Sequence, residues 1–186
     1  MLCTWLRCLA GLLMMKNTRM NDFYHMSANP LVMGAEIHGN GKDKVDPRIE
    51  AELEKRRPCD MLSRRDAVYA RPISDFSRCG IVNSGYIYRV HLNGKTQRHD
   101  LSWIGPMQMA LLKQKYAGTL SEGMKKHPDW TSELVERCCA NYWAGADSGE
   151  AVWECLARSF TVLEALSDQP VTVGATKGGW PPASAI

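Results

Sequence analysis

Three short segments of the chain carry side chains that could take part in chemistry. In the first, His25 and Ser27 offer an imidazole and a hydroxyl that can hold a sugar hydroxyl and an amide. In the second, Tyr69 ends a short apolar run, and its ring offers a flat face on which an aromatic ligand can stack. Both patterns also fit side chains with a structural role only. The histidine would then be hydrogen-bonded within the fold, and the tyrosine would be a half-buried strand residue that packs on the core.

The third segment places a carboxylate among apolar neighbours. If it forms a strand, Val152, Glu154 and Leu156 share one face. A buried charge is costly unless it is paired, so the pattern indicates use in binding a sugar hydroxyl or in stabilising developing positive charge. If the segment is helical instead, Glu154 is solvated.

In order and spacing, the three segments resemble the ADP-ribosyltransferases of the His-Tyr-Glu group, which include the poly(ADP-ribose) polymerases and the rifampicin-modifying enzymes. Residues 24–27, 68–70 and 154–156 are similar to the first, second and third motifs of that family. Met26 departs from the pattern, because the family usually has glycine there. The residue two positions before Glu154 is not a second glutamate, which argues against arginine as the acceptor.

The resemblance implies an α+β fold in which two small packed β-sheets form a cleft for NAD and a helical insertion lies between their strands. It implies an NAD-dependent ADP-ribosyltransferase that cleaves the nicotinamide–ribose bond and transfers ADP-ribose to a macromolecular acceptor. No metal is implied. A toxin, an effector or a phage-encoded modifier fits this activity, with an antitoxin or inhibitor protein as a partner.

The resemblance also assigns the site. The expected catalytic residues are Glu154, His25 and Tyr69, and the expected NAD-binding residues are His25, Met26, Ser27, Tyr69 and Arg71. In that assignment Glu154 binds the ribose 2′-hydroxyl and stabilises an oxocarbenium-like state, while Tyr69 stacks on the nicotinamide ring. Glu150 is the alternative catalytic glutamate.

Charge bears on the acceptor. The chain has 23 Lys and Arg against 20 Asp and Glu, which gives a formal net charge of +3. This charge is too small to indicate by itself a protein that binds nucleic acid. Residues 55–78 nevertheless hold seven Lys or Arg against three Asp. They could form a solvated face, contact the NAD pyrophosphate or attract RNA or DNA. Protein is the preferred acceptor, and a catalytically silent module that binds protein or nucleic acid through this basic cluster is the alternative.

Local signals predict the elements that hold these segments. Asp46 and Pro47 predict a helix that ends before Pro58. Further helices are expected over 106–116 and from Asp129 to Gly145, and strands are expected at 67–70 and 85–92, with a polar return strand at 95–99. Residues 152–156 and 161–166 are expected to form strands, or a strand that passes into a helix. The aromatic residues within 100–142 should mostly pack in a core, and a lid that closes with loop 144–149 is the alternative.

The chain is expected to divide into three parts. Residues 1–19 are an N-terminal extension or a mis-assigned start, residues 20–166 are the catalytic domain, and residues 167–186 are a flexible tail. No apolar run reaches the length of about 20 residues that spans a membrane. Seven cysteines without a paired spacing favour a reducing compartment, hence a cytoplasmic protein, including one delivered into a target cell.

Overall fold

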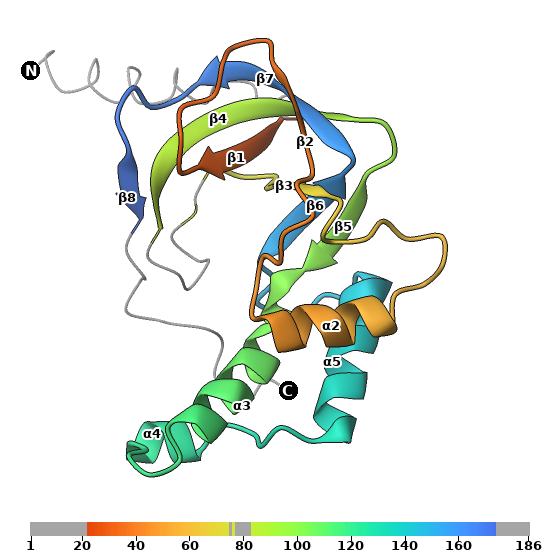
Figure 1. Ribbon diagram of the computed structural model, residues 1–186, viewed down its shortest axis with the longest axis vertical. Coiled ribbons are helices and arrows are strands. Elements are labelled where there is room, and N and C mark those ends of the chain that lie inside the picture. The colour runs from red at the N-terminus through yellow and green to blue at the C-terminus, as the bar shows by residue number, and fades with distance from the viewer. Residues whose placement is uncertain (1–21, 75, 77–82, 174–186) are drawn as a thin grey trace, which may run out of the picture.

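The computed structural model describes residues 22–74, 76 and 83–173, which form an α+β architecture (Figure 1). The strands are β1 (Phe23–Ser27), β2 (Glu36–His38), β3 (Val68–Ala70), β4 (Asn83–Asn93), β5 (Gln97–Asp100), β6 (Trp153–Ala157), β7 (Ser159–Ala165) and β8 (Val171–Val173). The helices are α2 (Pro47–Lys55), α3 (Gly105–Lys115), α4 (Glu122–Lys125) and α5 (Ser132–Ala144), with a short 3-10 turn at Leu101–Trp103. The predicted N-terminal extension, residues 1–19, lies outside the described residues.

The strands form two antiparallel sheets. One has the order β1-β4-β7-β2, with β8 also paired to β4, and the other has the order β3-β6-β5. A single residue, Arg158, separates β6 in one sheet from β7 in the other. A backbone bridge between Tyr24 and Arg71, with N–O distances of 2.8 and 2.7 Å, joins β1 to the end of β3. The predicted α+β class with two small sheets is therefore confirmed.

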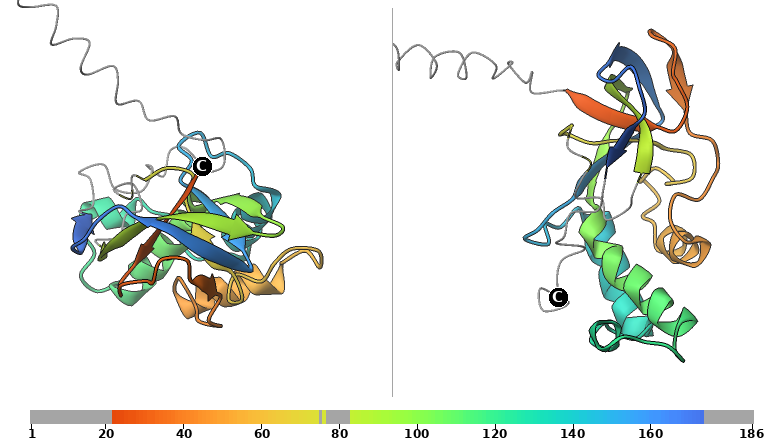
Figure 2. Two further views of the ribbon diagram at one scale, coloured as in Figure 1. Left: turned by 90° about the horizontal axis from the view of Figure 1, so that it is seen from above. Right: turned by 90° about the vertical axis from the view of Figure 1, so that its left-hand side faces the viewer.

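Sheets and helices occupy opposite ends of the molecule. Figure 1 and the right-hand view of Figure 2 show the strands at one end and α3, α4 and α5 at the other, with α2 beside α5. The segment predicted as a helical insertion is indeed mostly helical, since α3, α4 and α5 all lie between β5 and β6.

Helix ends follow the predicted capping residues with one exception. Asp46 accepts a hydrogen bond from the Arg48 N–H and caps α2, and Gly145, with a φ of 64°, ends α5 in the left-handed conformation. The predicted N-cap of α5, Asp129, is wrong, because Thr131 accepts from the Leu134 N–H instead. Asp129 forms an ion pair with Lys113 at 2.9 Å.

Two strands differ from the sequence prediction in what they pair with. The segment after the Asn93-Gly94 turn forms β5 but does not return along β4; β5 pairs with β6, which buries His99 and Asp100 in the second sheet. After Ser167, where the sequence shows no core pattern, β8 pairs with the start of β4.

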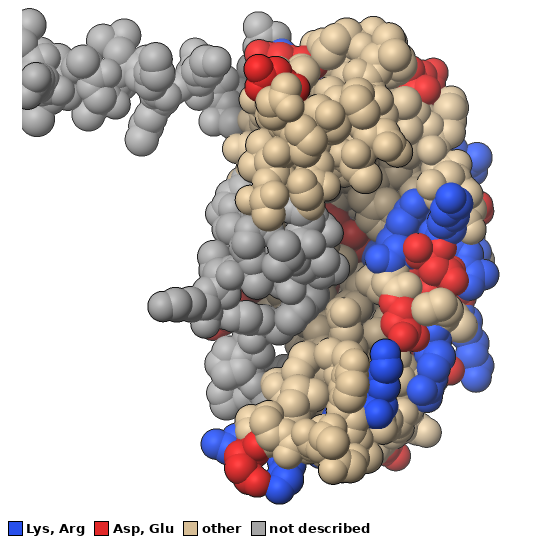
Figure 3. All heavy atoms as spheres, turned by 60° about the vertical axis from the view of Figure 1, so that its left-hand side comes forward, with Lys and Arg blue, Asp and Glu red and all other residues tan. Residues whose placement is uncertain are grey.

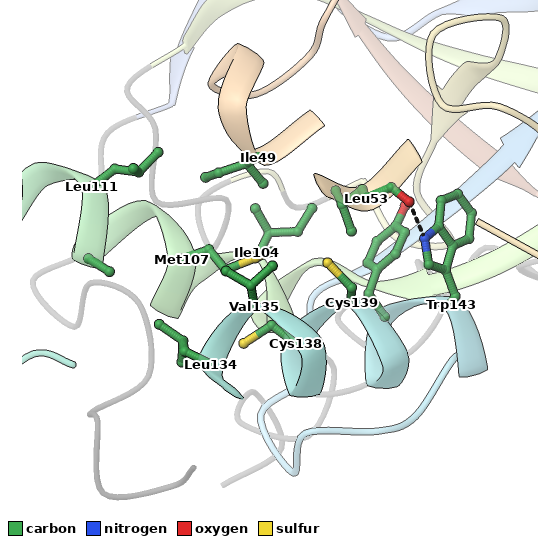
Figure 4. Close-up of a cluster of buried hydrophobic side chains, with 12 residues drawn as sticks. Ile49, Leu53, Ile104, Met107, Leu111, Leu134, Val135, Cys138, Cys139 and Trp143 are labelled. Carbon is green, nitrogen blue, oxygen red and sulfur yellow. Dashed lines mark hydrogen bonds between the residues drawn. The ribbon is translucent and has the colours of Figure 1, made fainter. Parts of the chain in front are cut away.

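Two hydrophobic cores hold the fold. The helical core joins α2, α3 and α5, and the indole N–H of Trp143 donates to the Leu53 carbonyl at 2.8 Å within it (Figure 4). The sheet core lies between the two sheets and includes Ala70 and Cys155 of the three-stranded sheet and Phe160 of the other. Because side chains alternate along a strand, the residues next to Ala70 and Cys155 face the other way, toward the helical half.

Candidate functional site

Glu154 lies on β6, on the face turned toward the helices. It is only 3% exposed, and its Oε1 accepts hydrogen bonds from the Arg64 guanidinium and, at 2.6 Å, from the Tyr142 hydroxyl. The predicted strand and the predicted buried, paired carboxylate are both confirmed, and the helical alternative is wrong. The alternative glutamate, Glu150, is exposed in the turn before β6.

Arg64 is the centre of the group around Glu154. Its side chain is 1% exposed, and its Nε donates to Glu50 Oε1 at 2.8 Å. We call Arg64, Glu50, Glu154 and Tyr142 the buried polar cluster. Burial alone would lower the pKa of Arg64, but Glu154 and the other partners outweigh it and hold this pKa well above the ordinary value. Arg64 is therefore always charged.

These contacts correct the basic cluster expected over residues 55–78. Arg64 and Arg71 are buried, and Arg56 and Arg57 are paired with glutamates of α2 or of α5. Arg65 is bound to Asp43 at 2.6 Å. The part of the cluster that the structure describes is therefore not a continuous cationic track, and Arg78 lies outside the described residues.

Tyr69 stands between the two other predicted catalytic residues. Its hydroxyl donates to the Arg64 carbonyl at 2.5 Å, and its ring lies 5.0 Å from the Arg64 guanidinium and 5.6 Å from Lys44 Nζ. Burial raises the pKa of the phenol, so the hydroxyl stays protonated. Two cations of the chain, Lys44 and Arg64, thus already lie against this ring.

His25 is fixed by the same tyrosine. Its Nδ1 lies 2.7 Å from the Tyr69 carbonyl, and its ring packs on Phe160 with centroids 4.7 Å apart. Burial lowers the pKa of His25, so the imidazole is neutral near pH 7. A carbonyl only accepts, so Nδ1 carries the proton and Nε2 is left as an acceptor.

The structure links the three predicted catalytic residues indirectly. His25 bonds to Tyr69, Tyr69 bonds to Arg64, and Arg64 bonds to Glu154. Among the described residues, no hydrogen bond, ion pair or ring contact joins His25 directly to Glu154. The three therefore share one continuous chain of contacts without forming a closed triad.

The other predicted NAD-binding residues belong to β1, which pairs with β4, and to the segment that follows β3. Met26 and Ser27 end β1, and the Ser27 hydroxyl accepts from the Asn29 N–H at 3.3 Å. Arg71 is buried and its Nε lies 3.4 Å from the Trp153 carbonyl. Arg71 is thus engaged at the start of β6, next to Glu154.

Sequence reasoning missed several members of the site. Glu50 could have been found, because it lies next to Ile49 and three positions before Leu53 on the buried stripe of α2. His99 carries no such signal; its Nδ1 bonds to the Tyr142 carbonyl at 2.9 Å, and its buried Nε2 has no partner among the described residues. Burial also lowers the pKa of His99.

The loop considered as a lid is held in place. The Ser148 N–H donates to Asp100 Oδ2 at 2.9 Å, and the Trp103 indole N–H donates to the Ala146 carbonyl at 2.8 Å. A Cβ on Gly145 would lie 2.9 Å from the Arg98 carbonyl oxygen. These contacts fix loop 144–149 against β5 and favour the packing role over closure.

The outer surface carries charged groups around a hollow. Figure 3 shows a hollow between the sheet end and the helical end, with acidic surface at its bottom and Lys and Arg along one rim. Lys44, which lies over the Tyr69 ring, is an exposed cation of the β2–α2 loop.

Comparison of the chain with protein-family models, with curated proteins and with solved structures gave no match. Within the described ranges, no helix is long and apolar enough to cross a membrane. The described residues also contain no group of three or more His, Cys, Asp or Glu side chains that could hold a metal ion. The chemistry of the site therefore rests on its own geometry.

Proposed function

We propose that the protein is an NAD-dependent ADP-ribosyltransferase, which cleaves the nicotinamide–ribose bond and transfers ADP-ribose to a macromolecular acceptor. One observation carries this proposal. His25, Tyr69 and Glu154, which are far apart in the sequence, belong to one chain of contacts that crosses from β1 through β3 to β6. The fold thus brings the three predicted catalytic residues into one region.

Two unused acceptor atoms support a ribose ligand. The hydrogen bonds to Glu154 all reach Oε1, and none of the described residues donates to Oε2. His25 Nε2 likewise has no partner among the described residues, while Nδ1 is fixed by the Tyr69 carbonyl. A neutral imidazole nitrogen and a carboxylate oxygen both accept, and ribose hydroxyls are donors.

The charge of the buried polar cluster supports the bond cleavage. The cluster contains two carboxylates, Glu50 and Glu154, and one guanidinium, so the negative charge is in excess. When nicotinamide leaves with the electron pair of its bond to C1′, positive charge develops on the ribose. A carboxylate already held by Arg64 and Tyr142 stabilises that charge without reorganising.

The acceptor then attacks C1′ through a nucleophilic atom and gives its proton to water. We propose a protein acceptor, since the described cations of residues 55–78 are buried or ion-paired to a large extent and do not form a phosphate track. A nucleic-acid acceptor held by several phosphates would instead show transfer that falls steeply with salt.

The test is release of labelled nicotinamide from NAD by the purified protein, with and without cell lysate. Glu154→Gln should lower the rate by about 100-fold or more, the loss typical of one electrostatic contributor. The matched control is Glu164→Gln on β7, whose carboxylate is 47% exposed and bonded to Arg89 at 3.0 Å. It should keep the normal rate.

Thermal melting followed by circular dichroism separates loss of chemistry from loss of fold, because Arg64 retains Glu50 in Glu154→Gln. A folded wild-type protein that releases no nicotinamide under either condition would replace this proposal with the catalytically silent interaction module. A normal rate in Glu154→Gln would show that Glu154 is not the catalytic glutamate, and Glu150 would be the next candidate.

A further inference from the structure

Lys44 is a cation that lies at the site without an anionic partner. It belongs to the loop between β2 and α2, and its Nζ lies 5.6 Å from the centroid of the Tyr69 ring. The ammonium donates one hydrogen bond, at 2.7 Å, to the side-chain carbonyl of Asn40. No carboxylate of the described residues lies within ion-pair distance of Nζ.

The groups around Lys44 destabilise its charged form, so its pKa is lowered. Partial burial lowers its pKa, and the nearby charges of Lys42 and Arg64 act in the same direction against the opposing effect of Glu50. Lys44 in turn contributes to the lowered pKa of His25, which places its charge near that imidazole as well. An ammonium in such a position gains more from an added anion than a solvated lysine does.

On the basis of the proposed function, we infer that Lys44 binds the pyrophosphate of NAD. The nicotinamide ring of NAD is itself a cation and can take the place of the ammonium over Tyr69, since aromatic faces attract cations. The displaced ammonium then needs an anion, and the same ligand supplies one. Lysine suits this exchange because it is a point charge on a flexible four-carbon stem.

The two arginines near the site are not placed to bind the pyrophosphate. Arg64 is enclosed by Glu50, Glu154 and Tyr142, and Arg71 is buried against the Trp153 carbonyl. Lys44 is exposed on the side of Tyr69 that lies toward the loop. The contact with the pyrophosphate, expected of an arginine within residues 55–78, is therefore assigned to Lys44 of the β2–α2 loop.

The experiment compares two substrates that differ in the pyrophosphate. NAD carries it, and nicotinamide riboside keeps the same scissile bond without it. For Lys44→Ala, we expect kcat/KM for NAD to fall about 10-fold or more, through KM, which is the worth of a hydrogen bond to a charged group. The value for nicotinamide riboside should not fall, because this substrate lacks the pyrophosphate and its ring no longer has to displace the ammonium from Tyr69. Lys44→Arg should restore part of the loss for NAD.

Lys42→Ala is the matched control, because Lys42 is an exposed lysine of the same loop. An equal loss for both substrates, or an equal loss in Lys42→Ala, would overturn the assignment. Calorimetric titration with ADP-ribose tests it without turnover, and Lys44→Ala should weaken that binding by a similar factor. Failure of the proposed function is distinct, since the wild type would then release nicotinamide from neither substrate.

Discussion

Replacing Arg64 with methionine should be among the most destabilising single changes in this protein. The substitution keeps an apolar stem but removes the cation between two carboxylates, whose side chains are 1% and 4% exposed. Removing one partner of a buried ion pair costs about 3–5 kcal/mol, because the charge that remains is uncompensated. A domain of this size is stable by only about 5–15 kcal/mol. At about 2–4 °C per kcal/mol, the melting temperature should fall by roughly 6–20 °C.

Urea and thermal denaturation of three variants measure this effect. Arg65→Met is the matched control, because the neighbouring Arg65 is 42% exposed and its ion pair with Asp43 is worth about 1 kcal/mol or less. The third variant combines Arg64→Met with Glu50→Gln and Glu154→Gln. With all three charges removed, it should recover most of the stability that Arg64→Met loses.

Two results would refute the reasoning about the buried polar cluster. One is a destabilisation by Arg64→Met that is no larger than that of Arg65→Met. The other is a triple variant that is no more stable than Arg64→Met alone, which would mean that packing rather than charge compensation sets the cost.

Two further predictions concern pH and the loop before β6. Burial lowers the pKa of His25 and His99, so the unfolded chain binds more protons and the free energy of unfolding should fall as pH drops below about 6.5. Urea melts of His25→Gln/His99→Gln between about pH 7.5 and 5 should show a shallower slope, and an unchanged slope would contradict the prediction. Asp100 accepts three backbone N–H groups, including that of Ser148, so Asp100→Asn should cost about 1–3 kcal/mol in urea melts. The exposed Asp147→Asn should cost clearly less, and equal costs would argue against this role of Asp100.

The parts of the fold that the sequence predicts are those decided by neighbouring residues. Asp46 and Pro47 begin α2, and Gly145 ends α5, because capping and left-handed backbone depend on residue type at one position. The predicted start of α5 at Asp129 was wrong, because Thr131, two positions later, is also a residue type that caps helices. Thr131 accepts from the N–H of Leu134, which lies in the helical core.

The residues of the site also fall into those that a local sequence pattern predicts and those that it does not. Alternation along residues 152–156 predicted the buried carboxylate of Glu154, because strand periodicity is local. No sequence pattern around Arg64 predicts that its side chain is buried. The neighbouring Arg65 has the same side chain and is half-exposed. The pairing of Arg64 with Glu154 depends on the tertiary fold, which brings the turn before β3 close to β6 and which a single sequence does not display.

The reach of Arg64 along the chain has a consequence for synthesis. Its partners Tyr142 and Glu154 follow it by 78 and 90 positions. While the ribosome makes the chain, Arg64 therefore emerges soon after Glu50 but long before Tyr142 and Glu154, so the buried polar cluster stays incomplete until β6 appears. Contacts between distant residues form slowly. Because β6 completes the cluster and pairs with β3 in the same step, a nascent chain that stops before Glu154 exposes an unpaired strand edge, the kind of surface that chaperones and proteases act on.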